Sequence, residues 1–373
     1  MFKAKFSVVC AAVVACVAPF LTPVTASASA AGGAPAAGSS CDGGLGHVAR
    51  PVATRSDSAG GKFYDYDFGN GQTSTQVEAP SNFDALTASD QDRAHYALPS
   101  RPVGGAPEEV TSWTSAMAGY RGRAETLVPY LCYDDGVKPV SASVLPTEGS
   151  CTQGVCGNYS GYQGTQGPYN AVTGNVVVPQ DGALCASASH ASTWVGLGGQ
   201  LQTRGLMQAG TITRTLGGGA TPYTEAFYEW VAGSGGGTTV SPITSPSWQP
   251  LPGATLFERV QFNAVTGGTN YYVGDVNNGN NRLTMTVSNQ ASYYDSTHAG
   301  FITENHLSLE SNPKHAPWVW SHAVTIRTTG SSYGVQTQAP ISYGGVNSSN
   351  TLVEYPSAFT GTASFNDNWA ACS

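Results

Sequence analysis

The feature that most constrains the fold is a series of short runs rich in Val, Thr, Tyr and Phe, which begins near residue 155. Clusters of Gly, Asn and Pro, such as "TGGTN" and "VNNGNN", separate the runs. Many short strands at regular spacing are typical of a β-sandwich or β-barrel. The expected strands lie at residues 170–179, 192–199, 204–214, 223–231, 256–265, 269–276, 281–290 and 322–329. We predict an all-β domain with no long helix after residue 155.

The first thirty residues resemble a secretory signal peptide rather than a part of the fold. Lys3 and Lys5 form a short basic region, residues 8–21 are almost wholly apolar, and "ASASA" offers small residues for cleavage. The apolar stretch is too short for a good membrane span. We therefore expect a protein that is exported and is not anchored in a membrane.

The composition narrows the possible partners. Only 11% of the residues are charged, and the formal net charge of -8 becomes -10 once Lys3 and Lys5 leave with the signal peptide. An acidic surface argues against nucleic acid as a partner. A chain with few carboxylates also has few ion pairs to lose in acid, which favours tolerance of low pH.

The mature chain divides into three parts by pattern. Residues 31–150 are expected to be a flexible lead and a prosegment, with one helix within residues 82–102 that Thr87 or Ser89 can cap. Residues 151–330 carry the β-sandwich. Residues 331–373 form a C-terminal extension that could add an edge strand.

Six cysteines remain after the signal peptide, and an even number in a secreted chain suggests disulfides. Fifteen pairings are possible, and Cys151 and Cys156 could close a small loop. The six are Cys41, Cys132, Cys151, Cys156, Cys185 and Cys372.

One glutamine stands out in the expected strand at 204–214. Alternation places Gln208 on the same face as Leu206 and Ile212, among apolar residues, so it needs a hydrogen-bonding partner or a task. The next strand carries Glu229 between Tyr228 and Trp230. A carboxylate between two large aromatic residues is either hydrogen-bonded nearby or has a raised pKa.

Several of these motifs occur together in one known family. "WVGLGG", "LMQAGT" and "YEW", with "GNYSGY" and "YNAVTGNVVVP" upstream, resemble motifs of the glutamic peptidase (eqolisin) family in their order along the chain. "FDALTASDQDRAHYALPSRP" is similar to the start of the prosegment in bacterial members. The resemblance covers about residues 82–102 and 157–330.

The resemblance implies a concanavalin-like or jelly-roll β-sandwich with a substrate groove on a concave face. It also implies a catalytic pair in which a Glu takes a proton from water and a Gln amide donates to the developing oxyanion. The glutamine corresponds to Gln208. We place the groove residues at Trp194, Tyr228, Trp230 and Tyr162.

The catalytic Glu is the point where the resemblance departs from the family pattern. Aligning "HAGFITEN" with the family's strand puts Gly300 at the position of the Glu, and Glu304 lies on the same face four residues later. Four residues of strand span about 13 Å. Either Glu304 or Glu229 serves as base, or the alignment shifts and Asp295 or Glu310 does, or the fold persists without the chemistry.

We therefore predict a secreted glutamic-type endopeptidase that acts on polypeptides at acid pH as a monomer, without a cofactor or metal. The alternative is a catalytically silent protein that binds peptide or carbohydrate in the same groove. His298, His306, His315 and His322 match no compact metal-ligand spacing, and no G-x-S-x-G motif supports a serine hydrolase.

Overall fold

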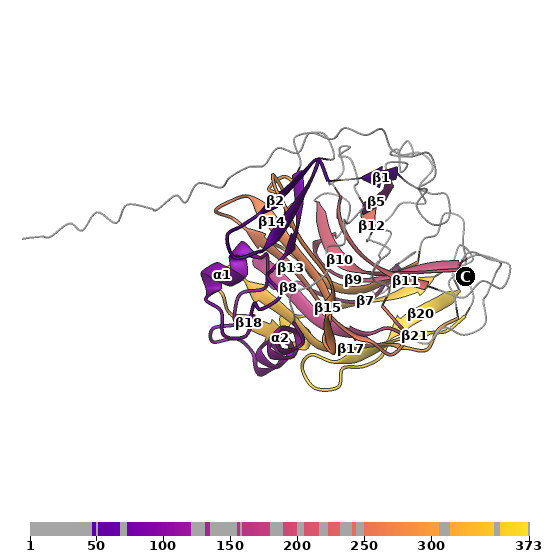
Figure 1. The fold of residues 1–373 in the computed structure, drawn as a ribbon. Coiled ribbons are helices and arrows are strands. Elements are labelled where there is room, and N and C mark those ends of the chain that lie inside the picture. The colour runs from indigo at the N-terminus through magenta and orange to yellow at the C-terminus, as the bar shows by residue number, and fades with distance from the viewer. Residues whose placement is uncertain are drawn as a thin grey trace, which may run out of the picture. The chain divides into compact units, whose positions relative to one another are not determined.

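Two antiparallel sheets packed face to face make up the computed structural model, and residues Gly32–Ser373 form one compact unit. The sheets are called A and B. Figure 1 shows the two layers, with the helices α1 and α2 on the side of sheet B. The structure describes residues 47–49, 51–67, 73–120, 131–134, 155–156, 159–179, 189–199, 205–215, 223–231, 241–243, 250–305, 314–346 and 351–371.

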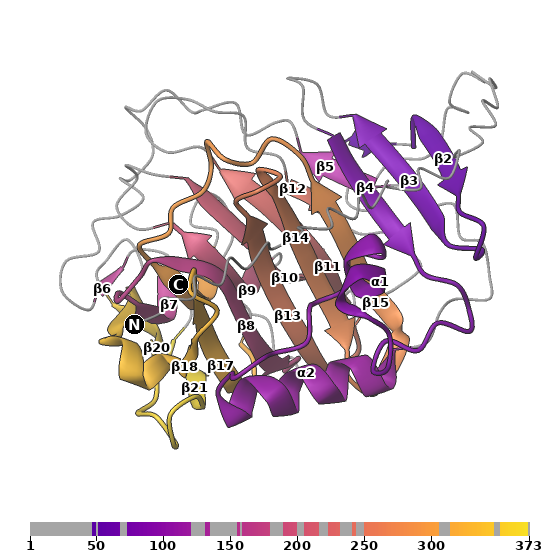
Figure 2. The ribbon, with the colours of Figure 1, turned by 90° about the vertical axis from the view of Figure 1, so that its left-hand side faces the viewer.

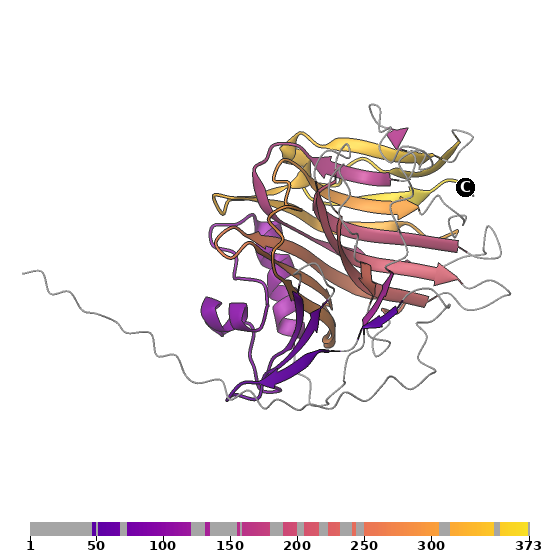
Figure 3. The ribbon, with the colours of Figure 1, turned by 90° about the horizontal axis from the view of Figure 1, so that it is seen from above.

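Sheet A is built from neighbouring antiparallel strands. Figure 3 shows several of them side by side. Their spatial order is β1(His47–Ala49), β5(Leu131–Asp134), β12(Ser241–Ile243), β11(Tyr223–Val231), β10(Leu206–Thr215), β9(Ser189–Gly198), β16(Ala299–Asn305), β7(Tyr159–Gly164) and β19(Ile341–Val346).

Sheet B follows the same antiparallel rule. Its order is β2(Ala53–Ser56), β3(Lys62–Asp67), β4(Thr73–Glu78), β15(Asn278–Val287), β14(Gly268–Asp275), β13(Thr255–Asn263), β8(Tyr169–Val177) and β17(Trp318–Arg327).

The C-terminal strands close one side of the sandwich. β18(Ser332–Gly334) and β21(Phe365–Trp369) pair with opposite halves of β17, and β20(Leu352–Pro356) pairs with β21. A 3-10 helix, η1(Val335–Gln338), precedes β19. β19 pairs with both β7 and β20, and with β6(Val155–Cys156) in parallel. The extension beyond residue 330 is thus part of both sheets.

The main core lies between the sheets because alternate residues of each strand point inward. Val195 and Leu197 of β9 and Met207 and Ala209 of β10 face this core. Residues of the opposite parity, such as Trp194, Leu206 and Ile212, form a second buried cluster on the outer face of sheet A.

The N-terminal segment is built into the sandwich rather than attached to it. β4 pairs with β15 at the edge of sheet B, and Tyr64 and Tyr66 of β3 are buried in the main core. α1(Asp90–His95) and α2(Pro107–Gly119) follow. Figure 2 shows α2 running across sheet B.

Two buried polar contacts fasten α2 to the sheet beneath it. Glu109 lies 3.3 Å from the guanidinium of Arg259, and both side chains are nearly fully buried. The hydroxyl of Ser112 donates to Asn175 at 2.6 Å. Replacing Glu109 alone would leave Arg259 buried without its partner, which costs far more than an exposed unpaired charge does.

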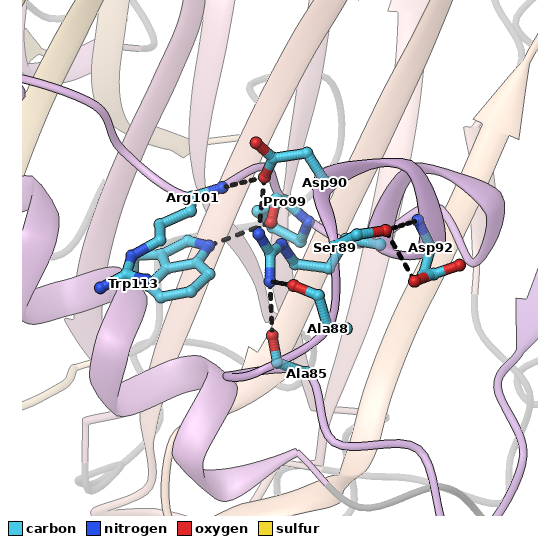
Figure 4. Close-up of polar contacts among 9 residues, drawn as sticks. Ala85, Ala88, Ser89, Asp90, Asp92, Pro99, Arg101 and Trp113 are labelled. Carbon is cyan, nitrogen blue, oxygen red and sulfur yellow. Dashed lines mark hydrogen bonds and ion pairs between the residues drawn. The ribbon is translucent and has the colours of Figure 1, made fainter.

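Arg93 holds the turn before α1 and the middle of α2 together. Its guanidinium donates to the carbonyls of Ala85 and Ala88 and lies 5.3 Å from the ring centre of Trp113. Trp113 in turn donates to the carbonyl of Pro99, as Figure 4 shows. These contacts give the segment an ordered interior of its own.

The structure confirms the predicted all-β sandwich. The eight expected strands all form, with bounds shifted by a few residues, and α1 begins at the expected cap Ser89. α2 was not predicted, because Thr111, Ser112 and Thr114 within it favour other structures, although Pro107 and two glutamates signal its start.

The structure leaves several other predictions untested. The boundary at residue 150 and the removal of a prosegment stay predictions, although residues on both sides of that boundary share one core. The signal peptide and four of the six cysteines lie outside the described residues, as do the side chains of Cys132 and Cys156. No described helix is long and apolar enough to cross a membrane.

Candidate active site

β9 and β10 owe their geometry to the glycine pair that interrupts the two apolar runs. Gly198 and Gly199 have φ values of +89° and +83°, which only glycine adopts without strain. The chain can therefore leave β9 and return as β10 in antiparallel register, with Gln208 opposite Gly196.

Gln208 lies in a row of five residues that are directly opposite one another across sheet A, which we call the Gln208 row. Glu229 on β11 pairs with Gln208, and Gly196 pairs with Gln208 from the other side. Gly300 on β16 pairs with Gly196, and Gln163 on β7 pairs with Gly300. All five residues lie on the outer face of the sheet.

The partner of Gln208 is Glu229. The amide Nε2 donates a hydrogen bond to Glu229 Oε2. Gln208 is 3% exposed and Glu229 is half-buried, and Gln208 Oε1 has no partner among the described residues. An uncharged amide thus lies against a carboxylate on the outer face. In acyl transfer a carboxylate can serve as the general base, and an amide can donate a hydrogen bond to the oxyanion.

Glu304 does not reach Gln208. It pairs with Ser192, which pairs with Ile212, so it lies four residues along the strands from the Gln208 row, or about 13 Å. Its carboxylate instead accepts a hydrogen bond of 3.0 Å from Trp194 Nε1. Of the two predicted bases, only Glu229 lies beside the glutamine.

Residues 157–358 match the model of the Peptidase A4 family. The chain belongs to this family. The match confirms the resemblance to glutamic peptidases that the motifs indicate. No curated protein matches the chain.

Three solved structures are similar to part of the chain. A scytalido-glutamic peptidase with a transition state analog inhibitor is 19% identical, with a TM-score of 0.45, over 57% of this chain and 98% of that one. SCP-B, described as an eqolisin in complex with a tripeptide Ala-Ile-His, is 18% identical over the same shares, with a TM-score of 0.42. Aspergilloglutamic peptidase from Aspergillus niger is 18% identical, with a TM-score of 0.40, over 49% of this chain and 99% of that one.

Gly300 is the residue that β16 contributes to the Gln208 row. The motif resemblance places the catalytic Glu at this position. Gly300 is in register with Gln208 through Gly196, so the row receives no acidic side chain from β16. A Cβ at position 300 would lie 3.2 Å from Ile302 and 3.4 Å from Trp194, so the space above it is already filled.

Trp194 lies on the same outer face as Gln208. It is buried, and its ring meets that of Tyr159 edge to face at 5.6 Å between centres. The apolar residues that pack around it are Leu206, Ile212, Phe227, Ile302 and Tyr343. Gln208 and Glu229 thus lie on the same face as a buried cluster of apolar and aromatic residues.

Three predicted groove residues are instead part of the main core. Tyr228 and Trp230 flank Glu229 and therefore must point to the opposite face, where both are fully buried. Tyr228 binds Ser74 through its hydroxyl at 2.9 Å. Tyr162 also faces the core, where its ring stacks on Phe359.

Of the two other candidate acids, the structure describes only Asp295, and it does not join the site. Asp295 is buried and accepts hydrogen bonds from the backbone and hydroxyl of Thr297, in the turn before β16. Glu310 lies outside the described residues. Among the residues that the structure describes, no group of His, Cys, Asp and Glu could hold a metal ion.

Gln163 is a site residue that the sequence did not reveal. It belongs to the Gln208 row, donates to the carbonyl of Gly198 at 3.0 Å and accepts from the hydroxyl of Tyr343 at 3.0 Å. Strand parity within "GNYSGYQG" places it on the outer face. The missing signal was the register, since only the pairing with Gly300 places it in the row.

Proposed function

We propose that this chain is a secreted endopeptidase that cleaves polypeptides at acid pH, with Gln208 and Glu229 as its catalytic pair. The observation that carries the proposal is the hydrogen bond between the Gln208 amide and the Glu229 carboxylate, on the outer face of a Peptidase A4 family fold. The signal-like residues 1–30 support secretion, and the protein acts as a monomer.

In the proposed reaction, Glu229 takes a proton from a water molecule whose oxygen attacks the scissile carbonyl carbon. The carbonyl oxygen becomes an oxyanion and accepts a hydrogen bond from the Gln208 amide. The protonated Glu229 then gives its proton to the leaving nitrogen as the C–N bond breaks. The products are a carboxylic acid and an amine.

The direct contact between Gln208 and Glu229 is compatible with the charges that form during the proposed reaction. Glu229 is negative before the attack and neutral once it holds the proton, so it does not repel the oxyanion that forms beside it. Gln208 keeps no net charge at any pH, and the bond to Glu229 fixes which end of its amide is the donor. The second Nε2 hydrogen is the one that serves the oxyanion.

A second candidate is a protein of the same fold that binds polypeptide without cleaving it. Gly300 favours it, because the Gln208 row lacks the carboxylate that the resemblance places on β16. The almost complete burial of Gln208 also favours it, since a substrate carbonyl has to reach that amide.

Two matched substitutions on β11 test the proposal. Glu229→Gln removes the base, and Glu225→Gln makes the same change on the same strand and face, four residues away. The assay is cleavage of acid-denatured haemoglobin by the purified full-length chain at about pH 3 to 5. We expect Glu229→Gln to lower kcat by about 10²- to 10⁴-fold and Glu225→Gln to lower it by less than about threefold.

Two other results decide against the proposal. If Glu229→Gln cleaves as fast as the parent, Glu229 is not the base. If the parent does not cleave but binds the denatured chain, the second candidate is correct.

A further inference from the structure

Trp194 and Glu304 form a buried pair on the outer face of sheet A. The indole Nε1 is a donor without an acceptor lone pair, and it points to Glu304 Oε2 at 3.0 Å. Trp194 is 1% exposed and Glu304 is 9% exposed. A hydrogen bond to a carboxylate in such surroundings is stronger than one between neutral groups, so it fixes the direction of the indole.

The other end of the indole lies over the Gln208 row. A Cβ built on Gly196 would be 2.8 Å from Cζ3 of Trp194, and one built on Gly300 would be 3.4 Å from the same atom. Two glycines therefore leave the space that the ring occupies. The indole thus reaches from Glu304, four residues away along the strands, to the glycine that pairs with Gln208.

This arrangement makes the indole a wall beside the catalytic pair. Cross-strand neighbours have Cβ positions about 4.5–5.5 Å apart, so the ring above Gly196 is next to Gln208. Tyr159 holds the ring from one side by an edge-to-face contact, and Ile302 and Leu206 line its surroundings. A flat apolar wall of this kind suits an apolar substrate side chain.

We propose that Glu304 is a positioning residue that holds Trp194 as the wall of a subsite for an apolar side chain beside Gln208 and Glu229. The proposal rests on the proposed function, since it takes this face to be the site that polypeptide enters. Glu304 is too far from Gln208 to take a proton from the attacking water, but it can orient the Trp194 indole that lies beside Gln208.

The variants separate the hydrogen bond from the charge. Glu304→Gln keeps an oxygen that accepts from the indole, Glu304→Leu removes it, and Trp194→Phe removes the donor. Gly196→Ala moves the ring without altering any polar group, because the new methyl would meet Cζ3. The oxidised B chain of insulin is the substrate, and the kinetic constants are kcat and KM.

We expect Glu304→Leu, Trp194→Phe and Gly196→Ala each to raise KM by about tenfold, while kcat changes by less than about threefold. Glu304→Gln should stay within about threefold of the parent in KM. Adding Glu304→Leu to Trp194→Phe should change nothing further, because the two residues act through one contact. The fluorescence contributed by Trp194, obtained by subtracting the Trp194→Phe spectrum, should shift in Glu304→Leu and not in Glu304→Gln.

Calorimetric binding of the same peptide separates this proposal from the catalytic one. If the parent binds without cleaving, the proposed function fails, and the same order of variants in Kd still supports the role of Glu304. The inference is overturned if Glu304→Leu leaves KM, Kd and the Trp194 fluorescence unchanged, or if the parent does not bind the peptide. It is also overturned if Glu304→Gln and Glu304→Leu lower kcat equally, because Glu304 would then act through its charge.

Discussion

Gln208 illustrates how far a single residue could be interpreted from the sequence. Alternation within "LMQAGT" placed its side chain on the face opposite Met207, and the structure has it there. The bond to Glu229 depends on the register between β10 and β11, which strand patterns alone do not give. The same alternation, applied to Tyr228 and Trp230, would have placed both in the core.

Glu258 is the residue whose environment contradicts its chemistry most strongly. It is fully buried on the inner face of β13. Burial raises the pKa of Glu258 well above its ordinary value, and the backbone of Val195 offsets this only in part. The folded protein therefore holds Glu258 protonated at a pH where the unfolded chain releases that proton.

Replacing Glu258 by Met should stabilise the protein at neutral pH by about 1–3 kcal/mol, because a fully buried carboxyl group is exchanged for an apolar side chain. The gain should shrink at pH 4, where the carboxyl is protonated in both states. Urea unfolding at the two pH values measures it. A loss of stability in Glu258→Met at pH 7 would show that Glu258 has a structural partner.

At the scale of elements, the strands were the predictable part and their partners were not. Runs rich in Val, Thr and Tyr gave β8 to β11 and β13 to β15, since alternation and turn residues are local signals. β4 pairs with β15 across about two hundred residues of sequence, and no local pattern indicates this. α2 stayed hidden because its apolar residues gain stability from sheet B rather than from helix propensity.

The contact between α2 and β13 gives a prediction at this scale. Arg259→Met should destabilise the protein by about 3–5 kcal/mol, because Glu109 would then be buried without its partner. The double variant Arg259→Met with Glu109→Leu should recover most of that loss, since it removes both charges. Chemical unfolding of the three proteins tests this. Equal stability of the single variant and the parent would mean that α2 does not hold the sheet through this pair.

At the scale of the whole molecule, buried proton-binding groups favour the folded state in acid. Burial, with the neighbouring charge of Glu354, raises the pKa of Asp367 well above its ordinary value, although the hydroxyl of Ser160 donates to it. Burial alone would lower the pKa of His315, but Glu354, 3.4 Å from its Nε2, raises it. These residues tie β20 and β21 to β7 at the closed side of the sandwich.

The sign of the pH dependence follows from these shifts. Glu258, Asp367 and His315 have raised pKa values, so the folded state binds more protons than the unfolded chain and loses stability as pH rises above about 4. The lowered pKa values of Asp57, Asp65 and Asp90 act below about pH 4, where stability falls as pH falls. Burial lowers the pKa of His322. Below about pH 6.5 its contribution to stability therefore falls as pH falls, which opposes the contribution of the three groups with raised pKa values.

We therefore expect the melting temperature to be highest at about pH 4–5 and to fall toward pH 8. Calorimetry of the full-length chain in matched ionic strength checks this, and His315→Gln should reduce the fall at the alkaline end. A melting temperature that rises steadily from pH 4 to pH 8 would contradict the account of these buried groups, and would weaken the case for action in acid.

The most direct test of the central claim is a double-mutant cycle on kcat/KM for peptide cleavage at acid pH, with Gln208→Ala, Glu229→Gln and both together. If the two residues act as one catalytic pair, each single variant lowers kcat/KM by about 10²-fold or more. The double variant then has a kcat/KM only slightly below that of the less active single variant. Full activity in either single variant, or losses that multiply in the double variant, would contradict the account.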